Sequence, residues 1–229
     1  MKTVAIIPAG GAGRRMGTDI AKQYLLLDGT PILIHTLKVF QDTPFIDDVI
    51  LTVPAGDIRS VGKKVWEEYG LSKVRTVLPG GKERQDSVKN GLDAVREDYD
   101  IVIIHDAVRC FISEEMIHAS IAGAFKYGAA VMGMPIQDTI KKISADGFID
   151  KTVARHGLWQ TQTPQAFQTA VIKRAYEAAY RDQFYGTDDA QLVERLGMPV
   201  MMLQGACHNI KITTKEDMSL GHMLINNLR

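Results

Sequence analysis

Short apolar runs alternate with longer segments of helical spacing along most of the chain. Apolar residues dominate positions 4–7, 49–53, 74–78, 101–104 and 129–134, and each run reads as a buried strand. Segments between them, such as PILIHTLKVF and ISEEMIHASIAGAFKYG, place apolar residues three and four positions apart, as amphipathic helices do. Because strands separated by helices need crossover connections, the pattern predicts an α/β fold with a mainly parallel, twisted sheet and helices on both faces.

Residues 138–153 interrupt this alternation. Their sequence, DTIKKISADGFIDKTV, reads as two polar strands around an Asp-Gly turn, which predicts a β-hairpin. The segment is too polar for a core strand, so we expect a protruding arm over about 136–157. A closing helix is expected from about residue 214, with Thr213 and Glu216 as its capping box.

Composition narrows the class of protein. The 229 residues contain 27 Lys and Arg and 27 Asp and Glu, and this balance argues against a nucleic-acid tail or a polybasic membrane anchor. No apolar run reaches the roughly 18–20 residues that cross a bilayer, and the N-terminus lacks a signal-peptide pattern. Two cysteines are too few for a disulfide framework. We therefore expect one cytoplasmic domain over residues 1–229.

A glycine loop, VAIIPAGGAGRRMG, follows the first apolar run. Such loops bring backbone N–H groups to phosphate. No Gly-Lys-Ser/Thr follows, as a P-loop requires, and Met16 stands where the dinucleotide fingerprint needs its third glycine. Arg14 and Arg15 inside the loop suit a phosphate whose charge builds up during a reaction. A strand-to-helix turn without a ligand is the alternative.

The apolar run in IVIIHDAVR ends in an acidic residue. Ligands of open α/β sheets bind at the carboxyl ends of the strands, where Asp106 would lie. Its carboxylate suits Mg²⁺ shared with substrate oxygens, and a helix cap is the alternative. His105 and Cys110 are interpreted as structural residues.

Eight phrases in register then identify a family. They are PAGGAGRRMG, KQYL, GGKERQDSV, HDAVR, DTIKK, RHGLWQTQTPQAF, TDD and NIKIT. Together they resemble the 2-C-methyl-D-erythritol 4-phosphate cytidylyltransferases of the non-mevalonate isoprenoid pathway. The resemblance implies a Rossmann-like nucleotidyltransferase fold, in which an acceptor phosphate attacks the α-phosphorus of CTP and releases pyrophosphate. The family phrase H-D-A-A-R-P carries Val108 and Cys110 here, so the restriction that proline gives the backbone is lost.

The resemblance also implies roles for individual residues. Arg15 and Lys22 would neutralise the α-phosphate, and Arg155 and Lys211 would bind the acceptor phosphate. Mg²⁺ would enter mainly through the CTP phosphates, with Asp106 as a candidate ligand. The glycines of GGKERQDSV would let the backbone approach the cytosine ring closely. A larger purine ring would clash with the backbone at this position. The implied CTP-binding residues are Pro8, Ala9, Gly10, Gly11, Gly13, Gly80, Gly81 and Ser87, and the implied acceptor-binding residues are Asp106, Arg109, Thr139, Thr163 and Thr187.

The sequence also bears on the oligomeric state and leaves alternatives for the function. The resemblance implies a homodimer, in which the arm of each copy clasps the other copy and reaches the acceptor site of that copy. The alternative is an arm that folds back on its own subunit. A ribitol 5-phosphate cytidylyltransferase shares most phrases, but TVARHGLW favours the methylerythritol group. A non-catalytic nucleotide-binding regulator on the same scaffold is a further alternative. The presence of both cation pairs, Arg15 with Lys22 and Arg155 with Lys211, argues against it. A nicotinamide-dependent dehydrogenase is opposed by the imperfect fingerprint.

Overall fold

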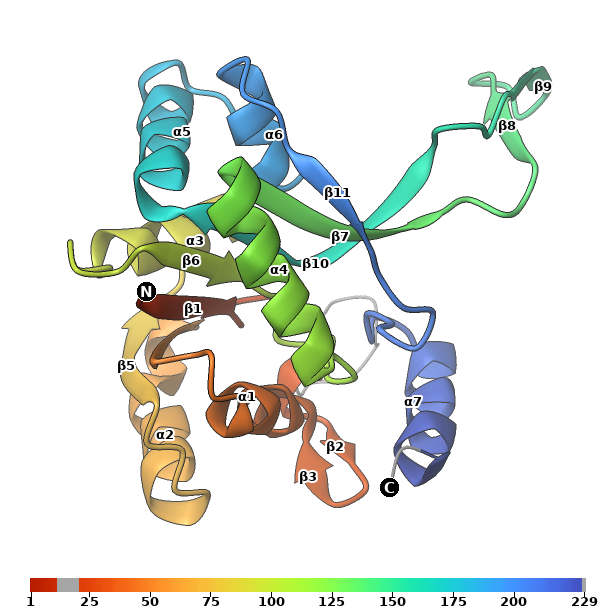
Figure 1. The fold of residues 1–229 in the computed structure, drawn as a ribbon. Helices are drawn as coiled ribbons and strands as arrows, with labels where there is room; N and C mark the ends of the chain where they lie inside the picture. Colours follow the sequence, from red (N-terminus) through yellow and green to blue (C-terminus); the bar gives the residue numbers. More distant parts are fainter. Residues whose placement is uncertain (12–20, 228–229) are drawn as a thin grey trace.

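A seven-stranded sheet forms the centre of the computed structural model, which describes residues 1–11 and 21–227 (Figure 1). Its strand order is β11-β7-β10-β6-β1-β4-β5, and every neighbouring pair is parallel except the two pairs that β10 makes, with β6 and β7. The predicted mainly parallel α/β fold is confirmed. The strands are β1 (Thr3–Pro8), β4 (Asp48–Val53), β5 (Val74–Pro79), β6 (Ile101–Ile104), β7 (Ala129–Pro135), β10 (Trp159–Gln168) and β11 (Met201–Gln204).

Different helices cover the two faces of this sheet. Ala5 and Ile7 of β1 pack with α1, α2 and α4, whereas Val4 and Ile6 pack with α3, α5 and α6. Alternate residues of a strand point to opposite faces, so a strand covered on both sides must be apolar throughout. The helices are α1 (Ile32–Asp42), α2 (Ile58–Lys63), α3 (Arg84–Asp93), α4 (Glu114–Tyr127), α5 (Thr169–Arg181) and α6 (Asp189–Arg195).

The chain closes with α7 (Lys215–Asn227), which joins a third apolar cluster containing Leu27, Ile212 and Ile225. No helix among the described residues is long and apolar enough to cross a membrane. The short elements are the ribbon β2 (Leu26–Leu27) and β3 (Thr30–Pro31), the 3-10 turns η2 (Lys22–Tyr24) and η3 (Ala55–Asp57), and the π-helical turn η4 (Lys64–Glu68).

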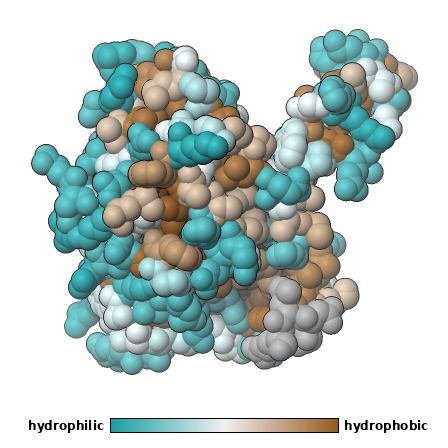
Figure 2. Space-filling model, in the orientation of Figure 1, coloured by the Kyte–Doolittle hydropathy of each residue, from teal (hydrophilic) through white to brown (hydrophobic). Residues whose placement is uncertain are grey.

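The predicted hairpin is confirmed as a protruding arm. Strands β8 (Ile140–Ile143) and β9 (Ile149–Val153) pair antiparallel, and Gly147 takes a φ of 85° in the turn between them. Ile136 N donates to Leu158 O over 3.0 Å at the base, so the arm continues the pairing of β7 with β10. Figure 2 shows the arm standing clear of the body.

Two local features differ from the expectations. Strand β10 is absent from the predicted strands, because its Gln and Thr residues resemble a surface segment although all of residues 162–167 are buried. Its ladder with β7 is irregular between Thr161 and Gln165, and such bulges re-aim side chains. The predicted capping box is wrong by one position. Helix α7 begins at Lys215, so Thr214 caps it and exchanges hydrogen bonds with Asp217.

Candidate active site

A cavity of about 290 Å³ opens at the carboxyl ends of β1 and β6. It brings together most of the predicted CTP-binding residues with Lys22, Asp106 and Lys211. Lysine and arginine outnumber acidic residues around it, which suits a polyanionic ligand. The lining residues are Pro8, Ala9, Gly10, Gly11, Lys22, Gln23, Gly81, Lys82, Glu83, Arg84, Ser87, Asp106, Ala107, Val108 and Lys211. The predicted residues Gly13 and Arg15 lie outside the described part of the chain.

Two glycine turns meet on one side of the cavity. A Cβ on Gly10 would lie 3.3 Å from Ser87 Oγ, and a Cβ on Gly80 would lie 3.0 Å from the same atom. The buried amide of Gln23 donates to Ala9 O over 2.7 Å and holds the first turn. A side chain at either glycine would therefore crowd the Ser87 hydroxyl where the two turns approach each other.

The hydroxyl of Ser87 shapes the second turn. It accepts from Gly81 N over 3.0 Å and donates to Glu83 O over 3.2 Å. A hydroxyl has one donor and two acceptor lone pairs, so one lone pair is left for the base contact that the sequence predicts.

Asp106 is the centre of a charged cluster at the end of β6. Its carboxylate lies 2.7 Å from Lys211 Nζ, 3.1 Å from Arg84 Nε and 3.7 Å from Arg109 Nε, and the residue is 7% exposed. Burial alone would raise the pKa of Asp106, but the three cations outweigh it and hold this pKa well below its usual range. The helix-cap alternative is wrong, since the next helix, α4, is capped by Ser113.

Arg84 is a site residue that the sequence interpretation missed. Besides Asp106, its guanidinium pairs with Asp189, whose carboxylate lies 2.8 Å away and is 1% exposed. Burial alone would lower the pKa of Arg84, but the two carboxylates outweigh it and raise this pKa above its ordinary value. Tyr176 also donates to Asp189, over 2.5 Å. Arg84 stands in GGKERQDSV and Asp189 stands in TDD. Both phrases were used to recognise the family, but the sequence does not show that these two residues form an ion pair.

Asp106 offers little room for a metal in this arrangement. Both of its oxygens contact cationic side chains, with Arg84 on one and Lys211 on the other. In the described part of the chain, no group of three or more His, Cys, Asp or Glu residues is placed to hold a metal ion. The protein can thus offer Mg²⁺ one carboxylate here, and the substrate phosphates must supply most of its ligands.

Thr163 supports Asp106 from the neighbouring strand β10. Its hydroxyl accepts from Asp106 N over 3.1 Å and lies 3.1 Å from His105 Nδ1. Burial lowers the pKa of His105 to about 4, so the ring is neutral. Its Nε2 lies 3.0 Å from Arg109 O and must donate to this carbonyl, which leaves Nδ1 to accept from Thr163. The structural interpretation of His105 is confirmed, and the Thr163 hydroxyl uses its donor on His105 and one of its two lone pairs on Asp106 N.

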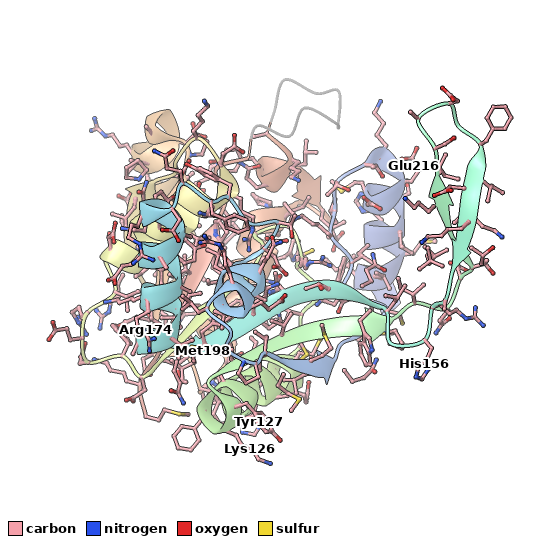
Figure 3. All side chains as sticks on the ribbon, turned by 90° about the horizontal axis from the view of Figure 1, so that it is seen from above. Lys126, Tyr127, His156, Arg174, Met198 and Glu216 are labelled. Atoms are coloured by element: carbon pink, nitrogen blue, oxygen red, sulfur yellow. The ribbon has the colours of Figure 1, made fainter. Side chains whose placement is uncertain are left out.

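The remaining acceptor residues lie apart from the nucleotide cavity. Thr139, Arg155 and Thr187 are exposed, and none of them lines it. The Arg155 guanidinium donates to Gln137 O at the base of the arm. In Figure 3 the labelled His156 of the arm and Glu216 of α7 lie on one side of the molecule, and Arg174 of α5 lies on the other.

A second, wider cavity of about 960 Å³ lies between the base of the arm and the segment before α7. Gln137 and Asp138 line it from the arm, and Arg109 and Lys211 line it from the body. Arg109 is held there by a 2.8 Å hydrogen bond to Asn209 O. Lys211 therefore borders both cavities, and two ligands bound side by side would meet at its ammonium group.

The geometry agrees with known relatives. A model of the 2-C-methyl-D-erythritol 4-phosphate cytidylyltransferase (IspD) family matches residues 3–227. A relative of that name in Syntrophus aciditrophicus is 48% identical over 224 residues, which are 98% of this chain and 96% of the relative. Another in Geobacter metallireducens is 46% identical over 228 residues, which are 98% of each chain.

Solved structures agree as well. The crystal structure of 4-diphosphocytidyl-2C-methyl-D-erythritol synthase from Anaerococcus prevotii matches with a TM-score of 0.85 at 32% identity, covering 98% of this chain and 96% of that one. The crystal structure of 2-C-methyl-D-erythritol 4-phosphate cytidylyltransferase from Thermus thermophilus matches with a TM-score of 0.82 at 31% identity, covering 99% and 100%. The resemblance in the sequence is thereby confirmed, and this chain belongs to the 2-C-methyl-D-erythritol 4-phosphate cytidylyltransferase family.

Proposed function

We propose that this chain transfers the cytidylyl group of CTP to 2-C-methyl-D-erythritol 4-phosphate, giving 4-diphosphocytidyl-2-C-methyl-D-erythritol and pyrophosphate. One observation carries the proposal beyond the family name: Lys211 borders both the glycine-lined cavity and the wider cavity beside the arm. CTP would occupy the first cavity and the sugar-alcohol phosphate the second, with their reacting phosphates meeting near Lys211.

The chemistry needs cations rather than a base. The acceptor phosphate is ionised at neutral pH, and its oxygen attacks the α-phosphorus as the bond to the departing pyrophosphate breaks. Lys22 would stabilise the charge on the α-phosphate, together with Arg15 of the glycine loop. An ammonium group has three donors, and the 2.7 Å contact with Asp106 uses one of those on Lys211. The other two are left for phosphate oxygens, with Asp106 fixing the position of the side chain.

Magnesium would enter with the nucleotide. Mg²⁺ is typically bound through one or two carboxylates and the phosphates of the substrate. Arg84 and Lys211 already contact the Asp106 carboxylate, so the CTP phosphates would supply most of the ligands and Asp106 at most one. When bound, the ion would neutralise part of the triphosphate charge. We expect activity to require a divalent cation.

The arm is proposed to complete the acceptor site of a second copy. A two-stranded hairpin is marginal in water on its own, and the exposed apolar side chains of Ile143, Phe148 and Ile149 need a cover. Two-fold homodimers are the commonest assembly that could provide it. In such a dimer Arg155 and Thr139 of one copy would face the second cavity of the other.

Pyrophosphate release from each nucleoside triphosphate with each acceptor tests the function. Release should be fastest with CTP and 2-C-methyl-D-erythritol 4-phosphate, and it should stop in excess EDTA. Faster release with ribitol 5-phosphate would change the acceptor, and equal rates with ATP would contradict the pyrimidine-sized site. CTP binding without any transfer would indicate a regulator instead.

A further inference from the structure

The start of α3 and the segment before α6 are joined by consecutive side chains. The buried Gln85 amide donates to Phe184 O over 3.0 Å and accepts from Gly186 N over 2.9 Å, across 99 and 101 positions of the sequence. Arg84 pairs with Asp189 in the same junction. The two phrases GGKERQDSV and TDD are therefore parts of one unit.

Asp86 extends this junction to the surface. Its Oδ1 accepts from Tyr180 over 2.5 Å and from Tyr185 over 3.0 Å, and its Oδ2 accepts from Glu83 N over 2.9 Å. Burial alone would raise the pKa of Asp86, but these hydrogen bonds outweigh it and hold the pKa below its ordinary value. The two tyrosine rings meet edge-on, with centroids 6.1 Å apart. One charged carboxylate thus has three donors, two of them from the far end of α5 and the loop that follows.

Asp86 also lies against the turn that faces the nucleotide cavity. A Cβ on Gly81 would come within 2.1 Å of Asp86 Cβ, so the backbone of the turn rests directly on this residue. The turn is also tied to Asp86 through Glu83 N. Gly81 and Glu83 line the cavity, whereas Asp86, Tyr180 and Tyr185 do not. Any effect of these three residues on a bound nucleotide must pass through the turn.

We propose that Asp86, Tyr180 and Tyr185, the loop clasp, are positioning residues that hold the 80–83 turn in the shape that recognises cytosine. The proposal rests on the proposed function, since it takes CTP as the ligand. None of the loop-clasp residues lines the cavity, so loosening the loop clasp should weaken CTP binding and base discrimination more than the chemical step.

The test removes the phenol hydroxyls and keeps the rings. Tyr180→Phe, Tyr185→Phe and the double variant would be compared with the wild-type protein for kcat and KM with CTP and UTP, and for the Kd of CTP by calorimetry. Each hydroxyl bonds a charged group, so the double variant should raise KM and Kd for CTP about tenfold. Its kcat should change by less than about twofold, and its preference for CTP over UTP should narrow. Asp86→Asn should act in the same direction.

Tyr99→Phe is the matched control. Tyr99 donates to the Asp48 carboxylate at the amino ends of the strands, away from the cavity. It should lower the Tm without changing KM. A double variant that lowers the Tm as the control does, with wild-type KM, Kd and CTP preference, would show the loop clasp to be structural only and overturn the proposal. Wild-type protein that binds CTP without transferring it would contradict the proposed function, and the Kd comparison would still decide the loop clasp.

Discussion

Acidification should destabilise the protein through His105. The ring is fully buried, and burial lowers its pKa to about 4 from the ordinary 6.5. The unfolded chain takes up a proton on this histidine below about pH 6.5, whereas the folded protein does so only near pH 4. Stability is therefore complete above pH 6.5 and falls as the pH drops towards 4. One unit of pKa difference is worth about 1.4 kcal/mol, so the loss across this window is about 3 kcal/mol.

The control is His105→Gln, whose amide can still donate to Arg109 O but cannot take up a proton. Free energies of unfolding from urea titrations between pH 7 and 4.5 would be compared for the two proteins. Asp106, whose pKa is lowered in the folded state, loses its contribution only as the pH falls below about 4, outside this window. The stability advantage of the wild type should shrink with acid. Parallel curves for the two proteins would refute the assignment.

Three further outcomes are expected at the charged residues. Lys22→Ala should lower kcat by about two to three decades, and a rise in the KM for CTP with kcat intact would contradict its role in the chemical step. Inactive Lys211→Ala and Arg155→Ala chains, co-expressed with different tags, should regain activity as heterodimers if the arm completes the partner's site; verified heterodimers without activity would place each site within one chain. Arg84→Ala leaves the buried Asp189 charge without its cation, so the free energy of unfolding in urea should fall by about 3–5 kcal/mol. A loss below about 1 kcal/mol would show that this ion pair is not needed for stability.

The alternating pattern predicted the central strands and the arm because their burial follows directly from residue type. Strand β10 was missed because three of its six buried residues, Gln162, Thr163 and Gln165, are polar. Gln162 is satisfied through Ala206 and Asn209, and Gln165 through Asp188 and the backbone of residues 189 and 190. These partners are distant in the sequence, and no local periodicity marks them.

Some residues of the site were predicted and others were missed, for a similar reason. The glycine turns, Lys22, Asp106 and Lys211 meet in one cavity, as the family phrases imply. Arg84 was overlooked because its importance depends on Asp189, which approaches it only in the fold. The roles of Arg15 and Gly13 stay predictions, since both lie outside the described residues.

Strand β10 links the arm to the site without an intervening loop. It begins beside the arm, pairing Trp159 with Pro135, and midway along it Thr163 holds the Asp106 backbone. The length of β10 between Trp159 and Thr163 is therefore constrained by the arm on one side and by the site on the other. An added residue between Trp159 and Thr163 would redirect the arm and displace the support of Asp106 together. The exposed turn around Gly147 is free of both constraints, so a residue added there would leave the support of Asp106 in place.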